Sequence, residues 1–156
     1  MDTRPPQTAA DERSTLLGFL DYLRAAVAAK AEGVPEPQVR RAGVPSGTSL
    51  LGLVKHLDAV ERFYFLGEAT TDWAPTMRPG PDETAEGLLA AYRDATRRAN
   101  EVIGAHPDLA LPAPLPPGRK SASSMRWLLV HMIEETGRHA GHADILREQI
   151  DGATGR

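Results

Sequence analysis

Proline and glycine divide this chain of 156 residues into four long segments in which apolar residues recur at helical spacing. Apolar residues three and four positions apart lie on one face of a helix, which can then be buried. The spacing predicts helices over residues 11–32, from a cap at 46–49 to 67, from 82 or 84 to about 105, and from 121–124 to 150. No stretch shows the alternation typical of a strand, so the sequence predicts an all-α fold.

The connections between these segments are long and rich in proline. They read GVPEPQVRRAGVPSGTS, EATTDWAPTMRPGPDET and PDLALPAPLPPGRK, and proline supplies no amide hydrogen for a helix or a central strand. We therefore predict a four-helix bundle with long crossover loops, formed as a single domain by residues 11–152. Residues 1–10 are predicted to form a flexible tail. Because long loops in compact domains are often functional, Trp73 and the third loop are candidates for pocket walls.

Composition and charge narrow the classes of function. The formal net charge is −3 and no long basic run occurs, so we expect no nucleic-acid partner. No stretch contains the roughly 18 apolar residues of a membrane span, and the first ten residues lack the apolar run of a secretion signal. We therefore expect a cytoplasmic protein without a membrane partner. The chain has no cysteine, which excludes disulfides, thiolate ligands and a sulfur nucleophile of its own.

The last segment contains HMIEETGRHAGHAD, in which ionisable side chains share a helical face with apolar ones. At about 100° per residue, one arc of this helix contains both apolar and ionisable residues. The apolar ones are Trp127, Leu128, Met132, Ile145, Leu146 and Ile150, and five residues are ionisable. These are His131, Glu135, Arg138, His139 and His142. His56 likewise lies among apolar residues in GLVKHLDAVERF. Burying a charge costs several kcal/mol unless it is paired or binds a metal, so this pattern favours a metal site.

Glu135 and His139 are separated by one helical turn, so their side chains can converge on one ion. His56, from a facing helix, would supply a third ligand. Two imidazoles and one carboxylate suit zinc first, and also nickel, iron or manganese. Three protein ligands leave coordination positions open, which is typical of a catalytic rather than a structural site.

The spacing leaves alternatives open. His56 can be a core histidine satisfied by hydrogen bonds, and the two four-spaced residues can form an ordinary intrahelical pair. Glu135 can instead pair with Arg138 or with His131, which lies four residues before it. His142, near the same face, can be an outer neighbour of the metal, an exchangeable ligand or polar lining.

The segments GLVKHLDAVERFYF and RWLLVHMIEETGRHAGHADILRE together resemble the DinB/YfiT-like superfamily of four-helix metal-binding proteins. The resemblance covers nearly the whole chain and is closest to the actinobacterial mini-circle-type and mycothiol-dependent branch. The superfamily carries a histidine on its second helix and a four-spaced pair on its last helix, which match His56 and then Glu135 and His139. Other branches have histidine at the position of Glu135. The set found here is similar to that of mycothiol-dependent maleylpyruvate isomerase.

This resemblance implies one divalent metal and mycothiol as cosubstrate. It favours a thiol S-transferase, in which the metal lowers the pKa of the thiol and the thiolate attacks a small electrophile of unspecified identity. The lack of cysteine agrees with this, because the sulfur would arrive with the cosubstrate. Arg138 is expected to hold an anionic group or to neutralise Glu135, and the pocket is expected to be lined by Tyr64, Trp73 and Trp127.

Two other functions stay open at this point. In a metal-dependent hydrolase, Glu134 or Asp58 would be the candidate base. In a non-catalytic metal-binding bundle, we would expect a closed site, with His142 as a fourth ligand. Leu129 and Ile133, opposite the metal-binding arc, are predicted to face a loop, a neighbouring helix or a second copy of the chain, so a homodimer and a monomer are both compatible with the sequence.

Overall fold

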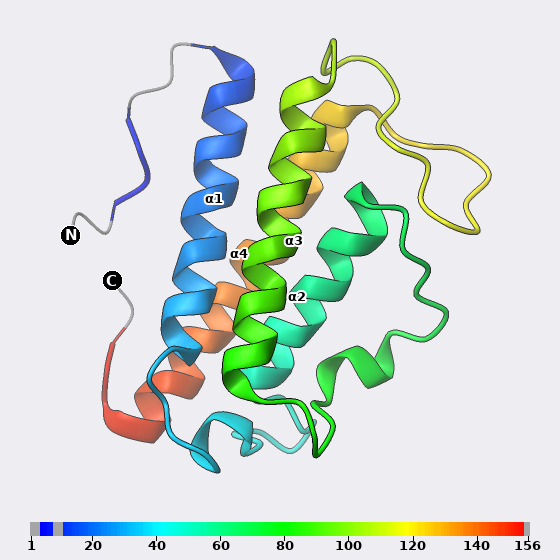
Figure 1. Ribbon diagram of the computed structural model, residues 1–156. Coiled ribbons are helices and arrows are strands. Elements are labelled where there is room, and N and C mark those ends of the chain that lie inside the picture. The colour runs from blue at the N-terminus through cyan, green and yellow to red at the C-terminus, as the bar shows by residue number, and fades with distance from the viewer. Residues whose placement is uncertain (1–3, 8–10, 155–156) are drawn as a thin grey trace.

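The computed structural model describes residues 4–7 and 11–154, and this part of the chain forms four α-helices and no strand. They are α1 (Glu12–Ala31), α2 (Leu50–Phe65), α3 (Ala85–Ala105) and α4 (Met125–Asp151). α1 packs chiefly against α4, and α2 chiefly against α3 (Figure 1). The predicted all-α four-helix bundle is thereby confirmed. The tail predicted for residues 1–10 falls mostly outside the described residues, so its flexibility stays a prediction.

Each of the four helices begins with a side-chain cap that satisfies a backbone N–H group at its first turn. In every case the side-chain oxygen accepts a hydrogen bond from the amide three residues further on. The capping residues are Asp11, Ser49, Thr84 and Ser124. At the other end of α4, Gly152 has a φ of 76°, the left-handed conformation that lets glycine end a helix. Each cap lies at a helix start that the sequence predicted, which is residue 11 for α1, 46–49 for α2, 82 or 84 for α3 and 121–124 for α4.

The crossover loops contain more regular structure than the sequence predicts. Two short 3-10 helices lie within them, η1 (Gln38–Arg40) and η2 (Ala74–Met77). Figure 1 shows the loop with η2 and the proline-rich loop on the same side of the bundle, beside α2. η2 docks directly on α2 at Gly52, where a Cβ atom would lie 2.2 Å from the carbonyl oxygen of Met77. Glycine is therefore what allows the two backbones to approach this closely.

The orientation of α4 corrects one expectation from the sequence. Trp127 and Ile145, predicted on the buried apolar arc, are 55 % and 57 % exposed. Leu128, Met132 and Leu146 of the same arc are buried, so the core side of α4 overlaps one edge of the predicted arc, and it packs largely against α1. Its buried residues are Met125, Leu128, Leu129, Met132, Thr136, Ala140, Ala143 and Leu146. Leu129 is completely buried and Ile133 packs beside it, so both residues have partners within the chain.

A buried ion pair joins α1 to α2 inside the bundle. The Arg24 guanidinium donates two hydrogen bonds of 2.7 Å to the Glu61 carboxylate, and both side chains are almost fully buried. Arg24 also donates to Asp21 at 2.8 Å and to the Asn100 side-chain oxygen at 2.7 Å. Burial opposes the charge on Arg24, but the Glu61 carboxylate outweighs it and raises the pKa of the guanidinium. Burial also raises the pKa of Glu61, against the effect of Arg24, and the two hydrogen bonds complete the pair without any further ligand.

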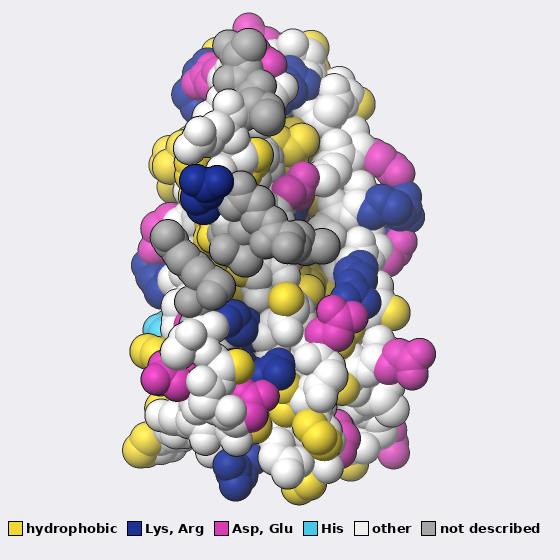
Figure 2. Space-filling view, turned by 90° about the vertical axis from the view of Figure 1, so that its left-hand side faces the viewer, with side chains coloured by type: hydrophobic (Ala, Val, Ile, Leu, Met, Phe, Trp, Pro, Cys, Tyr) yellow, Lys and Arg dark blue, Asp and Glu magenta, His cyan; other side chains and the backbone are white. Residues whose placement is uncertain are grey.

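The face of the molecule that Figure 2 displays carries no large area of a single charge. On this face, which includes α1, basic and acidic side chains are interspersed rather than gathered into areas of one sign. Within the residues that the structure describes, no helix combines the length and the apolar character needed to cross a membrane.

Candidate metal centre

The structure brings together the three residues that the sequence singled out as metal ligands. The Nε2 atoms of His56 and His139 lie 3.3 Å and 3.1 Å from the same oxygen, Oε1 of Glu135. Among the described residues, they form the one group of three potential ligands whose donor atoms all lie within 4.8 Å of one another. Their side chains are 12–17 % exposed, so the cluster is sheltered but open to solvent.

Two elements of the fold produce this convergence. Glu135 and His139 point the same way because they are one turn apart on α4. His56 approaches them from α2, and its ring meets that of His139 edge-on with centroids 5.0 Å apart. The cluster therefore depends on the tertiary packing of α2 near α4, although two of its members are close in sequence.

Thr76, in η2, determines which nitrogen of His56 carries the proton. Its hydroxyl donates to the carbonyl oxygen of Trp73 at 2.6 Å, so the single hydroxyl proton is already used. The Thr76 oxygen lies 2.8 Å from Nδ1 of His56 and must then accept a hydrogen bond from it. In neutral His56 the Nε2 atom consequently presents its lone pair to Glu135.

Two lone pairs facing each other at 3.3 Å require a cation or a proton between them. A single added proton satisfies one of the two contacts to Glu135, whereas a metal ion satisfies both together. The spacing also fits, because two ligand atoms about 2.0–2.1 Å from a tetrahedral zinc lie about 3.3 Å apart. The donor set and its distances therefore suit a divalent metal.

The electrostatics of the cluster favour the protonation states that bind a metal. Burial is the largest cause of the lowered pKa of His139, and it outweighs the opposing effect of Glu135. Burial alone would raise the pKa of Glu135, but the two histidines together lower it below its ordinary value. His139 is thus held neutral and Glu135 ionised, the forms in which imidazole and carboxylate act as ligands.

The other residues predicted at the site lie around the cluster. Trp73 packs edge-on against His56, with ring centroids 5.9 Å apart, and so covers the cluster from the η2 loop. His142 is exposed and places its Nδ1 atom 3.4 Å from Nδ1 of His139, beside the group of three. Arg138 is exposed and pairs with Glu134, not with Glu135.

His131 and its aromatic neighbours lie on the next turn of α4, towards its N-terminus. The His131 ring stacks on Trp127 with centroids 5.1 Å apart and an interplanar angle of 23°. Tyr64 of α2 meets the same His131 ring edge-on at 5.4 Å. These three side chains connect the cluster to the end of the bundle that carries the proline-rich loop.

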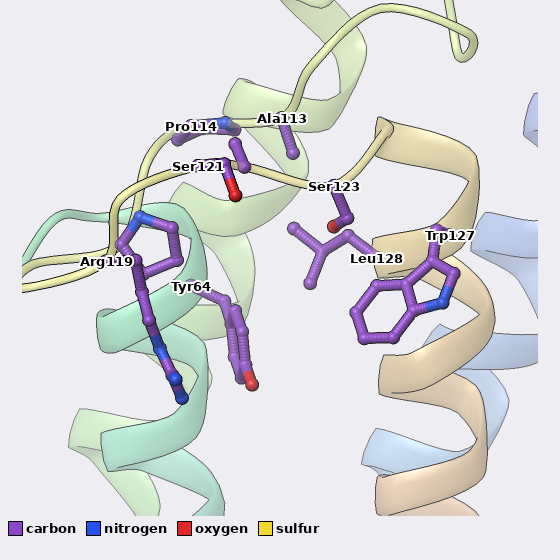
Figure 3. A pocket seen from close by; sticks show the side chains of 10 residues that line it. Tyr64, Ala113, Pro114, Arg119, Ser121, Ser123, Trp127 and Leu128 are labelled. Atoms are coloured by element: carbon purple, nitrogen blue, oxygen red, sulfur yellow. The ribbon is translucent and has the colours of Figure 1, made fainter.

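Cavities lie on either side of the cluster along α4. One, of about 280 Å³, is lined by Tyr64 and Trp127 and by the proline-rich loop (Figure 3). The other, of about 260 Å³, is lined by His142, which touches His139, and by apolar residues such as Ile145. Trp127 and Ile145 are exposed because they form walls of these cavities, which explains their departure from the predicted core.

Sequence reasoning missed Thr76 and Arg119. Thr76 follows Trp73 by three residues in a stretch that lacks helical periodicity, and only the docking of η2 on Gly52 brings it to His56. Arg119 lines the first cavity from the proline-rich loop. The one signal for it in the sequence is its place after Pro116-Pro117-Gly118, a combination typical of a tight turn.

An all-α bundle with a His/Glu/His cluster between its second and fourth helices defines a DinB-like helical protein. The chain belongs to the mycothiol S-transferase family, whose model, described as Mycothiol-S-transferase, matches residues 15–152. The match includes α1 from residue 15 onwards, all of α2, α3 and α4, and every residue of the cluster. No match was found among curated proteins.

Proposed function

We propose that this protein transfers the thiol of mycothiol to a small electrophile, using one divalent metal held by His56, Glu135 and His139. The observation that carries the proposal is the convergence of two imidazole nitrogens on one carboxylate oxygen, with Nδ1 of His56 held by Thr76 so that Nε2 faces Glu135. Membership of the mycothiol S-transferase family supports the choice of thiol. Zinc is the first candidate for the metal, and nickel, iron and manganese also suit this donor set.

The reaction joins sulfur to the electrophile and releases the thiol proton. With no cysteine in the chain, the nucleophilic sulfur must come from the cosubstrate. A divalent metal supplies Lewis acidity, which lowers the pKa of a thiol enough to leave thiolate near neutral pH. The protein contributes orientation, because Thr76 fixes the His56 ring while Trp73 shields it from bulk water.

Hydrolysis receives less support from the structure. Its candidate bases are Asp58 and Glu134, and each is engaged by an arginine one turn away. Asp58 accepts hydrogen bonds of 2.9 Å and 3.0 Å from Arg62, and Glu134 pairs with Arg138. Neither carboxylate belongs to the cluster of potential ligands. Burial raises the pKa of Asp58, but a carboxylate outside the cluster and engaged by an arginine is poorly placed to activate water on a metal held within it.

Metal content and thiol conjugation test the proposal together. We expect about one equivalent of metal per untagged chain after reconstitution with zinc. We also expect metal-dependent conjugation of mycothiol to 1-chloro-2,4-dinitrobenzene, followed by absorbance. His56→Ala should lose the metal while circular dichroism shows unchanged helix content. His106→Ala removes a histidine outside the cluster and serves as the matched control.

The outcomes separate the parts of the proposal. Unchanged metal stoichiometry in His56→Ala would overturn the ligand assignment. A protein that binds one metal but conjugates no mycothiol at any electrophile concentration would overturn the transferase assignment, and would leave the metal centre to another role.

A further inference from the structure

We propose that the cavity between Tyr64, Arg119 and Trp127 is the electrophile subsite, and that it selects electrophiles carrying an anionic group on a flat body. The inference rests on the proposed transferase function, since it names the second substrate of that reaction. Its evidence is separate, however, because none of these three residues belongs to the metal cluster.

Arg119 supplies a cation without a counter-ion. Its side chain forms no ion pair or hydrogen bond within the described part of the chain, although it lines the cavity. Most arginines of the bundle behave differently, as Arg24, Arg62 and Arg126 show with their carboxylate partners. An arginine that faces a cavity without a partner can bind a carboxylate or a similar anion through parallel hydrogen bonds.

The backbone fixes the position of this cation. The Arg119 amide donates to the carbonyl oxygen of Pro116 at 3.1 Å, which closes a four-residue turn. Pro117 and Gly118 are its central residues, and Gly118 has a φ of 75°, as a type II turn requires. From this rigid turn the Arg119 side chain extends alongside Tyr64, as Figure 3 shows.

The opposite wall offers a flat surface. Trp127 projects from α4 across the cavity from Tyr64 and Arg119 (Figure 3), and it is 55 % exposed. Stacking on His131 holds the indole in place. Ser121 and Ser123 add hydroxyl groups at the loop side. A planar body between two aromatic side chains, with a negative group at the guanidinium, matches this arrangement.

The second cavity is the better match for the thiol, which leaves this one for the electrophile. Apart from its sulfhydryl group, mycothiol is an uncharged amide-linked sugar conjugate. The second cavity is lined by hydroxyl and apolar side chains and His142, with no lysine, arginine or carboxylate. A neutral thiol needs no counter-charge, whereas an unpaired arginine discriminates an anionic electrophile from a neutral one.

The distance to the cluster suits a small molecule. Trp127 and Glu135 are eight residues apart on α4, which corresponds to about 12 Å of helix rise. His131 lies halfway and touches both Trp127 and Tyr64. An aromatic acid whose carboxylate meets Arg119 can therefore direct its far end towards the cluster.

A matched pair of electrophiles tests the inference, namely 4-chloro-3,5-dinitrobenzoate and its uncharged analogue 4-chloro-3,5-dinitrobenzamide. In both, the sulfur–carbon bond forms at the ring carbon that loses chloride, and the thiol proton passes to solvent. We expect Arg119→Gln to raise KM for the benzoate by about tenfold and to leave KM for the amide within about twofold. Lys120→Gln removes a neighbouring cation that does not line the cavity, and it should change neither value.

Calorimetric binding separates this inference from the proposed function. The unreactive 3,5-dinitrobenzoate should bind the zinc-loaded protein more tightly than 3,5-dinitrobenzamide, and Arg119→Gln should remove that difference even if no thiol is ever transferred. Equal binding of the two compounds, or an equal loss in Lys120→Gln, would overturn the subsite. Preferential benzoate binding without conjugation would support the subsite while contradicting the transferase reaction.

Discussion

Two polar clusters lie inside this bundle, and they differ in what completes them. In the first, the Arg24 cation donates two hydrogen bonds of 2.7 Å to the Glu61 carboxylate. Its third nitrogen, Nη1, donates to Asp21 and Asn100. In the second, Glu135 is approached by two histidines, of which His139 is held neutral by burial. The first cluster contains its own cation, whereas the second has the ligands for one.

The two clusters also differ in how deeply they are buried. Arg24 and Glu61 are almost fully buried, so separating them would leave an unpaired charge in the core. The His/Glu/His cluster is partly exposed and bordered by cavities, so ions and small molecules can reach it. The Arg24–Glu61 pair is complete within the core, and the His/Glu/His cluster is where we propose that a metal binds.

The largest change in stability is expected from breaking the Arg24–Glu61 pair. Arg24→Met should lower the free energy of unfolding by about 3–5 kcal/mol, because it leaves the Glu61 carboxylate buried without a cation. Urea denaturation measures this loss. The double variant Arg24→Met/Glu61→Leu should recover most of it, since no charge is then left in the core. A single variant as stable as the parent would show that the pair is not needed.

Binding of zinc to the His/Glu/His cluster should stabilise the protein by a smaller amount. Zinc at about 100 times its Kd is expected to add about 2.7 kcal/mol to the free energy of unfolding, or roughly 5–10 °C in Tm. A chelator should reverse the shift. Glu135→Gln, which removes the shared carboxylate, should abolish the response to zinc, whereas Arg24→Met/Glu61→Leu should keep it. A zinc response that survives in Glu135→Gln would place the ion elsewhere.

Loosening the orientation of one ligand should have a smaller effect still. Thr76→Val removes the acceptor for Nδ1 of His56 and should weaken zinc binding by about 10–100-fold without reducing helix content. Competition with a chromogenic chelator measures the affinity. Thr76→Ser keeps the hydroxyl and should restore most of it. Equal affinities in the parent and in Thr76→Val would contradict the assigned proton on Nδ1.

The smallest effect is a pH dependence of the metal-free protein. The pKa of His139 lies below the ordinary 6.5 in the folded state, so the unfolded chain takes up a proton first as the pH falls. The free energy of unfolding should therefore decrease from about pH 6.5 downwards, by about 1 kcal/mol or less, because the side chain is partly solvated. His139→Gln should flatten this part of the profile. An unchanged slope would assign it to other groups.

Local signals predicted a large part of this structure. The helices begin at the positions that the sequence predicted, and α4 ends at Asp151, one residue beyond the predicted 150. The four-residue spacing of Glu135 and His139 also determined that these two would meet, because one helical turn brings them together without help from the fold. His56 was placed beside them by its apolar surroundings and by the family resemblance.

What the sequence could not give depends on contacts between distant segments. The periodicity of α4 identified an arc of mixed apolar and ionisable residues, but it could not distinguish a core face from the wall of a cavity. Trp127 lies on that arc and is exposed, and it lines a cavity together with Tyr64, as expected for a pocket residue. Arg24 and Glu61 are 37 positions apart in the sequence, on two different helices, so no local pattern could predict their pairing. Thr76 and Arg119 act from loops, whose positions are set by docking and turn geometry.

The close contact at Gly52 has a consequence for altering this protein. Because the carbonyl of Met77 occupies the space of a missing Cβ, a single methyl group at position 52 would push η2 away from α2. Thr76 and Trp73 would move with it, while the three clustered side chains would keep their own helices. A substitution at position 52 would therefore change the position of Thr76 relative to His56 without replacing any residue of the His/Glu/His cluster.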